Sequence, residues 1–235
     1  MKYLRILDAF SITSYAGLSI WLLIRSAETF QSHPNPGFFI YIPLILILAY
    51  LAADLLSGVV HFLADNFGSA NTFILGPALV HPFRDHHVDP EGITRHGFLE
   101  TNGNNCLICV PILLGMHYAY DSLRPGWAFI MALAVNATLF FIFLTNQFHK
   151  WAHQTFPPAA VRTLQRMGLI LSPSHHSVHH RAPHLRNYCI TSGWLNPLLD
   201  RSGVLTAILR ISGKLSESTE NQLEQTEDSR RRFNA

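Results

Sequence analysis

Long apolar runs alternate with polar segments along the chain, and their lengths predict helices that cross a membrane. The apolar runs occupy residues 6–24, 38–62, 105–120 and 127–148. A helix needs about 20 mostly apolar residues to span a bilayer. Residues 38–62 and 127–148 meet this requirement most clearly, whereas residues 105–120 are fewer and contain Pro111. The pattern predicts an all-α, multi-pass membrane helical bundle with about four spans.

The first apolar run also has the character of a cleaved signal peptide. Lys2 and Arg5 precede it, and Arg25 closes it. A signal peptide ends at a small-residue cleavage site with a polar flank, and no clear example follows residues 6–24. We therefore expect a membrane span at this position.

The polar segments predict the parts outside the bilayer. Residues 66–103 are rich in turn-forming residues and predict a loop. Residues 157–171 have the pattern of an interfacial amphipathic helix with Pro at its start. Residues 187–199 are aromatic and contain Gly and Pro, which predicts a lid at the interface. We expect a membrane domain at residues 1–213 and a disordered polar tail at residues 214–235, which offers few apolar side chains to bury.

Composition agrees with a membrane protein and excludes some other classes. Hydrophobic residues make up 49% of the chain and charged residues 14%, with a formal net charge of +2. This is apolar for a soluble protein, and it lacks the basic footprint of a nucleic-acid-binding protein. The three cysteines do not form a disulfide framework. Cys106 and Cys109 form an isolated C-x-x-C, which predicts buried thiols in a helix rather than a zinc site.

Clustered histidines are the strongest chemical signal. Residues 172–184 hold five of the 14 histidines and no carboxylate, including the H-x-x-H-H array of His176, His179 and His180. Just upstream, His149 and His153 are one helical turn apart. Neutral imidazole is a common ligand of zinc, copper, iron and nickel. A histidine-rich tract that binds nothing would explain one cluster, but not several clusters embedded among apolar segments.

Ionisable residues also interrupt the apolar run at residues 38–62. Asp54, His61 and Asp65 follow one another at steps that keep them on one helix face. Such residues in a membrane helix usually point into the protein and mark function. We predict His61 as a ligand, Asp65 as a catalytic carboxylate and Asp54 as a supporting one, because metal-bound histidines need an acceptor for their second ring nitrogen.

The polar loop contributes a further pair, His86 and His87. Adjacent residues do not share a helix face closely, but they can bind two neighbouring metals, or one metal from a turn. His96 is a weaker candidate. Arg84 and Arg95 can hold an anionic lipid head group by bidentate contacts, or form ion pairs with acidic residues of the same loop.

These clusters supply enough imidazole for two metal ions. The candidate ligands are His61, His86, His87, His149, His153, His176, His179 and His180. A structural zinc needs four ligands and a catalytic zinc commonly three. Iron that activates O₂ on a lipid chain would also suit such a site, because breaking an unactivated C–H bond requires a redox cofactor. The residues by themselves do not select iron over zinc.

The distribution of cationic residues predicts the orientation. If the runs at residues 38–62 and 127–148 exit on one side, all histidine clusters meet at that membrane face. That side carries Lys2, Arg5, Arg84, Arg95, Lys150, Arg162 and Arg166, and the other side carries Arg25 and Arg124. The positive-inside bias then places the histidines in the cytosol.

The chain resembles the plasmanylethanolamine desaturase family, the lipid desaturase domain proteins. The matching segments are DLLSGVVHFLAD at 54–65, PFRDHH at 82–87, DPEGITRHGFLETNGNNC at 89–106, NQFHKWAH at 146–153, HHSVHH at 175–180 and CITSGWLN at 189–196. The resemblance implies a multi-pass membrane enzyme with a histidine-bound di-iron centre. It also implies conversion of a 1-O-alkyl ether phospholipid to the vinyl ether of a plasmalogen, with O₂ and electrons from cytochrome b5 or a similar donor.

Carried over to this sequence, the resemblance implies the same eight histidines as iron ligands. It adds three supporting histidines, His96, His175 and His184, and we note Asp200 as a further supporting carboxylate. The chain departs from the family pattern at Phe62, where relatives often have Trp, and at Gly97, where they often have Asp. Neither position touches a proposed ligand, so these departures concern substrate preference rather than chemistry.

Other functions fit parts of the same pattern. A plastid branch of the family desaturates an acyl chain of phosphatidylglycerol, although TRHGFLETNGNNC at 94–106 looks like the ether-lipid branch. A hydroxylase of the same di-iron class, a zinc hydrolase or metal transporter, and a non-catalytic membrane scaffold are the remaining alternatives. The membrane would be the endoplasmic reticulum in a eukaryote and the inner membrane in a bacterium.

Overall fold

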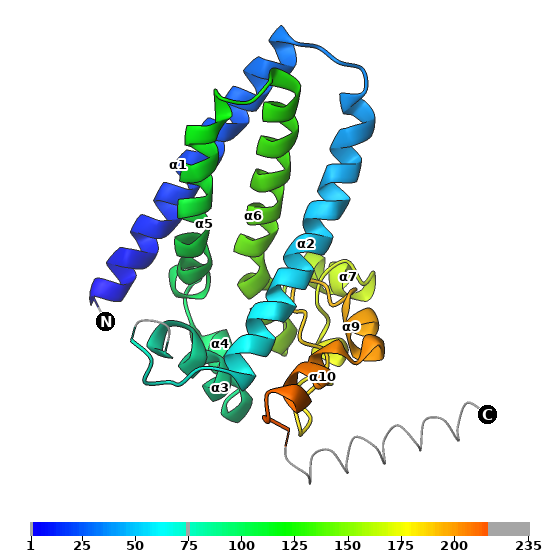
Figure 1. Cartoon of the computed structure of the whole chain (residues 1–235). Helices are drawn as coiled ribbons and strands as arrows, with labels where there is room; N and C mark the ends of the chain where they lie inside the picture. Colours follow the sequence, from blue (N-terminus) through cyan, green and yellow to red (C-terminus); the bar gives the residue numbers. More distant parts are fainter. Residues whose placement is uncertain (1, 74–75, 216–235) are drawn as a thin grey trace, which may run out of the picture.

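Four long helices lie side by side and alternate in direction (Figure 1). They are α1 (Lys2–Ser32), α2 (Phe38–Asn66), α5 (Phe98–Tyr120) and α6 (Pro125–His153). Helix α6 packs against each of the other three. The computed structural model describes residues 2–73 and 76–215. Every regular secondary-structure element in these residues is a helix. This confirms the predicted all-α fold.

Shorter elements cover the end of the bundle where α2 and α6 finish (Figure 1). A π-helical turn η1 (Gly76–Val80), α3 (His81–Val88) and α4 (Gly92–Arg95) connect α2 to α5. After α6 come α7 (Ala159–Arg166), α8 (Pro173–His176), α9 (Asn196–Ser202) and α10 (Val204–Ile211). These elements bring distant parts of the sequence to one end of the molecule.

Three of the long helices have the length and apolar composition of membrane spans. They are Arg5–Ser32, Phe38–Asn66 and Pro125–His153, with mean hydropathies of 1.4, 2.3 and 2.2. Large apolar side chains point outward along them, for example Phe39 (72% exposed) and Ile40 (71% exposed). Such surfaces suit lipid rather than water, and the chain is an integral membrane protein.

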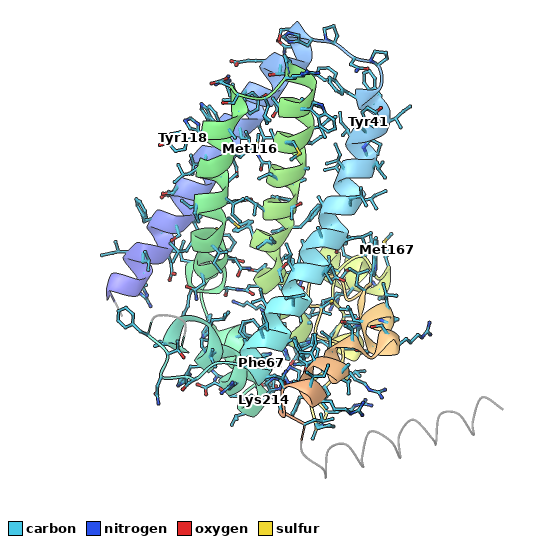
Figure 2. The ribbon with its side chains drawn as sticks, in the orientation of Figure 1. Tyr41, Phe67, Met116, Tyr118, Met167 and Lys214 are labelled. Atoms are coloured by element: carbon cyan, nitrogen blue, oxygen red, sulfur yellow. The ribbon has the colours of Figure 1, made fainter. Side chains whose placement is uncertain are left out.

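Exposed tyrosines lie toward the end of the bundle opposite the short helices. Tyr41 and Tyr118 are exposed there, whereas Phe67 and Lys214 lie at the other end (Figure 2). Tyrosine is enriched where a membrane helix meets water.

The predicted buried thiols are confirmed on α5, where Cys106 and Cys109 are free and 0% exposed.

The predicted loop at residues 66–103 was wrong in extent. It contains η1, α3 and α4, and α5 already begins at Phe98. In the second turn of α5, Thr101, Asn102 and Gly103 are buried, and polar groups there pair with α6. Asn102 donates from Nδ2 to Oε1 of Gln147 at 3.3 Å, and Asn146 donates to the carbonyl of Thr101 at 3.1 Å. Helix α5 also continues through Pro111.

The predicted elements after α6 also needed correction. The amphipathic helix expected at residues 157–171 is shorter and ends at Arg166. The lid expected at residues 187–199 is instead a buried segment. Its residues Tyr188, Cys189, Ile190 and Thr191 are each no more than 1% exposed. We call residues 187–196 the strap, because they lie across α2. Residues 216–235, which hold most of the predicted tail, lie outside the described residues.

Candidate metal centre

The eight predicted ligand histidines come from four regions and meet at one end of the bundle. Helix α2 carries His61 near its end, and α6 carries His149 and His153 in its last turn. Helix α3 provides His86 and His87. The remaining three lie at α8 and in the turn that follows it, namely His176, His179 and His180. The structure divides these side chains into two groups.

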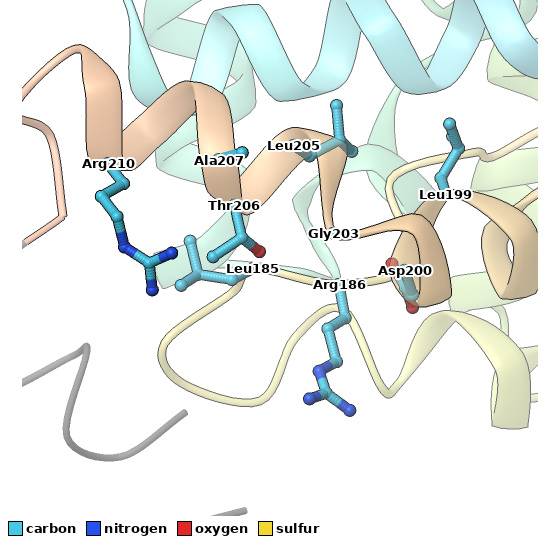
Figure 3. A pocket seen from close by; sticks show the side chains of 9 residues that line it. All are labelled: Leu185, Arg186, Leu199, Asp200, Gly203, Leu205, Thr206, Ala207 and Arg210. Carbon is cyan, nitrogen blue, oxygen red and sulfur yellow. The ribbon is translucent and has the colours of Figure 1, made fainter. Parts of the chain in front are cut away.

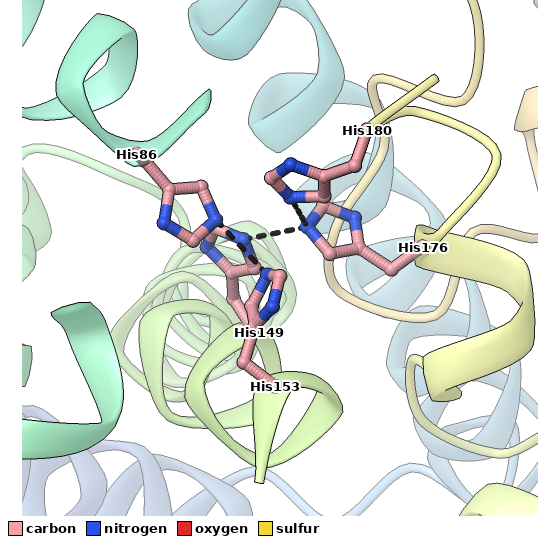
Figure 4. A group of neighbouring side chains, drawn as sticks. All are labelled: His86, His149, His153, His176 and His180. Carbon is pink, nitrogen blue, oxygen red and sulfur yellow. Dashed lines mark hydrogen bonds between the residues drawn. The ribbon is translucent and has the colours of Figure 1, made fainter. Parts of the chain in front are cut away.

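The first group contains five histidines, His86, His149, His153, His176 and His180 (Figure 4). One ring nitrogen from each lies within 4.8 Å of the others. The Nε2 atoms of His86 and His153 are 2.9 Å apart, and Nε2 of His176 is 2.8 Å from that of His149. Nitrogens bound at right angles to one metal at about 2.1 Å would be about 3 Å apart.

Hydrogen bonding within this group does not account for its crowding. Nε2 of His176 is 2.8 Å from Nε2 of His149 and 3.0 Å from Nε2 of His180. A neutral imidazole has one N–H and one lone pair, so one His176 nitrogen cannot donate to both neighbours. A shared cation would satisfy all three lone pairs.

Burial keeps the imidazoles outside the membrane helices neutral. Burial, with a smaller contribution from neighbouring imidazoles, lowers the pKa of His86 to about 2 and that of His180 to about 3. The pKa of His176 also lies well below its usual value, for the same two reasons. Neutral imidazole is the form that binds a metal.

The second group contains His61, Asp65, His87 and His179. Asp65 Oδ2 lies 3.1 Å from Nε2 of His87 and 3.4 Å from Nε2 of both His61 and His179. Three buried atoms of this group have no hydrogen-bond partner in the described part of the chain. They are Nε2 of His61, Nε2 of His179 and Oδ1 of Asp65. Buried polar groups are rarely left unpaired, so this donor set fits a cation.

Main-chain carbonyl groups orient two imidazoles of the second group. Nδ1 of His61 donates to the carbonyl of Tyr188 at 3.1 Å, and Nδ1 of His179 donates to the carbonyl of Arg186 at 2.8 Å. Each bond assigns the proton to Nδ1 and leaves the Nε2 lone pair for the site. Nδ1 of His184 lies 3.1 Å from Nδ1 of His87. The sequence does not reveal these carbonyls, because main-chain groups carry no residue-specific pattern.

Asp54 anchors the strap that supplies the Tyr188 carbonyl. It is 0% exposed and accepts hydrogen bonds from the main-chain N–H groups of Ser192 at 2.8 Å, Gly193 at 2.9 Å and Leu195 at 3.1 Å. Ser57 Oγ accepts a fourth from the strap at 3.0 Å. The predicted supporting carboxylate therefore lies away from both groups and acts on the chain that orients His61.

Other predicted supporting residues lie outside both groups. Nε2 of His175 is 3.0 Å from the side-chain amide of Asn196, and Asp200 accepts from the N–H of Asn187 at 3.4 Å. The ring of His96 is 47% exposed, and the structure does not bring it to either group. Its carbonyl accepts a bond from Lys150. These residues support the surrounding turns.

The two predicted head-group arginines have partners within the protein. Arg84 donates to the carbonyls of Ala64 at 3.3 Å, Phe67 at 3.1 Å and Gly68 at 3.3 Å, and so closes the end of α2. Arg95 forms an ion pair with Asp89. Their head-group role stays a prediction.

A cavity of about 560 Å³ opens onto the first group. His153, His176 and His180 line it together with Asp89 and Glu91. The cavity gives small molecules a path to these imidazoles.

A bundle of membrane helices with two adjacent imidazole-rich groups at one end defines an integral membrane protein with a candidate two-metal centre. The family follows from comparison with known proteins. The chain belongs to the lipid desaturase domain family, whose model matches residues 50–215. This range contains every residue of both groups.

Three relatives show how far the similarity extends. The chain is 45% identical over 193 residues to plasmanylethanolamine desaturase of Myxococcus xanthus, covering 82% of this chain and 66% of the relative. It is 43% identical over 173 residues to plasmanylethanolamine desaturase 1 of Mus musculus, covering 68% and 62%. It is 38% identical over 163 residues to the chloroplastic fatty acid desaturase 4 of Arabidopsis thaliana, covering 68% and 48%. The chain thus matches less than two thirds of the length of each of these relatives. No solved structure matches it.

Proposed function

We propose that this chain is an O₂-dependent desaturase that forms the vinyl ether of a plasmalogen from a 1-O-alkyl ether phospholipid. The reaction removes one hydrogen each from C1 and C2 of the alkyl chain and forms the C1=C2 bond. The two hydrogens, O₂, two electrons and two protons together yield two waters. The observation that carries the proposal is the pair of adjacent imidazole-rich groups at the end of the membrane helices. The names of the Myxococcus xanthus and Mus musculus relatives support the ether-lipid substrate.

Each group would hold one iron ion. The five histidines of the first group offer nitrogen alone, and the second group offers three histidines with Asp65. Bound iron would supply the redox chemistry that removes hydrogen from an unactivated C–H bond. Asp65 was predicted as a catalytic carboxylate. Because Oδ2 lies among three Nε2 atoms, we propose that it is a ligand.

The protein would orient the ligands and exclude water from the reacting carbons. The Tyr188 and Arg186 carbonyls fix two imidazoles, and the strap buries the side of α2 that carries His61. On the outer side of α2, Val60 (38% exposed) and Leu63 (46% exposed) face away from the protein. An alkyl chain can therefore approach the end of α2 without leaving the bilayer.

A separate donor, cytochrome b5 or a similar protein, would deliver the two electrons from the cytosol. Cationic residues at the histidine end of the bundle support this orientation through the positive-inside bias. They include Arg84, Arg95, Lys150, Arg162 and Arg166, whereas Arg25 and Arg124 lie at the opposite end. The membrane would be the endoplasmic reticulum or a bacterial inner membrane, according to the source.

Lipid mass spectrometry tests the activity directly. A host without plasmalogens would be fed a 1-O-alkylglycerol, with and without this gene, and its lipids compared before and after mild acid. We expect a product two mass units lighter than the alkyl lipid, which acid cleaves to an aldehyde and which His179→Ala abolishes. An acid-stable alkene would instead support acyl desaturation, the activity named for the Arabidopsis thaliana relative.

Two other results would reject desaturation altogether. Gain of one oxygen would identify a hydroxylase. Purified protein that contains zinc and changes no lipid, even with a reductase supplied, would favour the zinc-binding alternative.

A further inference from the structure

Helix α7 is followed by a turn, residues 167–169, that packs against the middle of α2. The hydroxyl of Tyr50 on α2 donates to the carbonyl of Leu169. The ring of Tyr50 also meets the ring of Trp194 in the strap, with centroids 5.4 Å apart and planes at 85°. Trp194 donates from Nε1 to the carbonyl of Gly168 at 2.6 Å. These contacts fix the level of the turn along α2.

The level of Tyr50 along α2 lies inside the bilayer. Helix α2, Phe38–Asn66, has the length and composition of a membrane span. At a rise of about 1.5 Å per residue, Tyr50 is about 18 Å from the first residue of α2 and about 24 Å from the last. The hydrocarbon core of a bilayer is about 30 Å thick. Wherever the core falls along α2, it therefore includes Tyr50 and the turn beside it.

The turn presents apolar side chains to its surroundings. Met167 is 64% exposed, Leu169 38% and Trp194 47%. We call these three side chains the turn patch. Met167 lies level with the middle of α2 in Figure 2. An exposed side chain at the level of the hydrocarbon core contacts lipid chains or another protein, and not water.

The main chain of the turn also suits a position without water. Carbonyl groups inside a bilayer need hydrogen-bond donors from the protein itself. The carbonyls of Gly168 and Leu169 have the two aromatic donors described above. Gln165, which is buried, donates from Nε2 to the carbonyl of Leu171 at 3.2 Å. Because water would serve such carbonyls at a wet surface, these side-chain donors favour a position among lipid chains.

Two arginines on α7 fit the same placement. Arg162 and Arg166 are exposed and one helical turn apart. Long cationic side chains keep their stems among apolar groups and extend their charged ends toward water and lipid phosphates. Helix α7 thus has the cations of a helix at the membrane interface, which the sequence predicted within residues 157–171. The apolar contact comes from the turn after α7 and from Trp194.

Exposed apolar side chains on α10 lie at a different level. Ile211 on this helix is 88% exposed. Helix α10 borders a cavity of about 150 Å³ that charged side chains, among them Asp200 and Arg210, also line (Figure 3). Through Leu209 it joins an apolar cluster with Phe67, which follows the last residue of α2. Helix α10 therefore lies at the membrane surface or outside it, and it provides a control.

We propose that the turn patch (Met167, Leu169 and Trp194) inserts among the lipid chains of the leaflet on the histidine side. This membrane contact follows α6 in the chain and is independent of the reaction that the protein catalyses. Trp194 belongs to the strap, whose Tyr188 carbonyl orients His61. The bilayer thus contacts the same segment that supports the second group.

Spin labels on introduced cysteines test this placement. Met167→Cys, Phe39→Cys and Ile211→Cys would each be labelled with a nitroxide in the full-length protein in phospholipid vesicles. The collision rates of each label with O₂ and with a water-soluble nickel chelate would then be measured. Phe39 on α2 is the lipid-facing reference, Ile211 is the matched control, and the wild type, whose three cysteines are buried, gives the background.

We expect the label at Met167 to collide more often with O₂ than with the nickel chelate, as the label at Phe39 does. The label at Ile211 should collide more often with the nickel chelate. A label at Met167 that matches the one at Ile211 would overturn the proposal. A label at Met167 that neither reagent reaches would also overturn it, because a second copy of the chain would then cover the turn patch.

The fluorescence of Trp194 provides a second measurement without a label. The contribution of Trp194 is the emission that Trp194→Phe removes. Lipids brominated on their acyl chains should quench this contribution, whereas iodide in the aqueous phase should not. Quenching by iodide alone would place Trp194 in water and reject the insertion.

Discussion

Replacing Asp54 with Asn tests how the strap supports the second group. The carboxylate accepts three main-chain N–H groups at 2.8–3.1 Å and is 0% exposed. Hydrogen bonds to a charged group each contribute about 1.5–3 kcal/mol. Asn keeps one acceptor oxygen but turns an NH₂ group toward a strap N–H, which leaves that donor unpaired at about 1–3 kcal/mol. With the lost charge, we expect the strap to be destabilised by about 2–4 kcal/mol.

Hydrogen exchange of strap amides measures this loss. If the strap opens locally, 2–4 kcal/mol corresponds to exchange that is roughly 30- to 700-fold faster in Asp54→Asn. Ser57→Ala removes one neutral acceptor from the same helix, worth about 1 kcal/mol, and should accelerate exchange roughly fivefold. We also expect less metal in Asp54→Asn, because the strap orients His61. Equal exchange in the two variants, or an unchanged metal content in Asp54→Asn, would refute this reasoning.

Three further predictions concern packing, metal content and pH. In Gly58→Ala the new Cβ would lie 2.5 Å from the sulfur atom of Cys189 in the strap. We therefore expect thermal unfolding to show a free energy of unfolding lower by about 1–3 kcal/mol. Gly115→Ala is the control and should be nearly neutral, because the new Cβ would meet nothing within 4 Å. His149→Ala should lower the metal content of purified protein and His96→Ala should not; the reverse would move His149 out of the first group. Burial lowers the folded-state pKa of His180 to about 3, below its unfolded value of about 6.5, so the unfolded chain binds more protons below pH 6.5. Unfolding of metal-free protein should therefore become easier as pH falls from 6.5 toward 3 and stay constant above pH 7.

Helical periodicity was enough to predict part of the centre. His149 and His153 are four residues apart in a clear apolar helix, and both lie in the first group. The array after them was less predictable, because His176 could pair with either His179 or His180 on a continuous helix. Helix α8 ends at His176, and the turn that follows directs His180 to the first group and His179 to the second. Where a helix ends depends on tertiary contacts, which a sequence pattern does not contain.

The strap shows why the lid prediction failed. Residues 187–196 contain Gly and aromatic residues that are typical of a surface loop, but their polar main chain is satisfied by side chains of α2. Asp54 and Ser57 together accept four N–H groups from this segment. A sequence shows that Asp54 is unusual in an apolar run, but not that its partners are main-chain groups 138 or more residues away.

The position of His86 and His87 on one short helix has a consequence for how the centre can vary. The two residues are adjacent in α3, yet one belongs to the first group and the other to the second. Their separation is thus fixed by the helix itself, with a rise of about 1.5 Å and a rotation of about 100° per residue. Helix α3 therefore sets the distance between the two groups. An insertion before His86 would turn both imidazoles away from their groups at once, so the spacing can be changed only by rebuilding the helix. Diversity in the lipids that such proteins accept is therefore expected in the cavities around the centre, while the distance between its two halves stays constant.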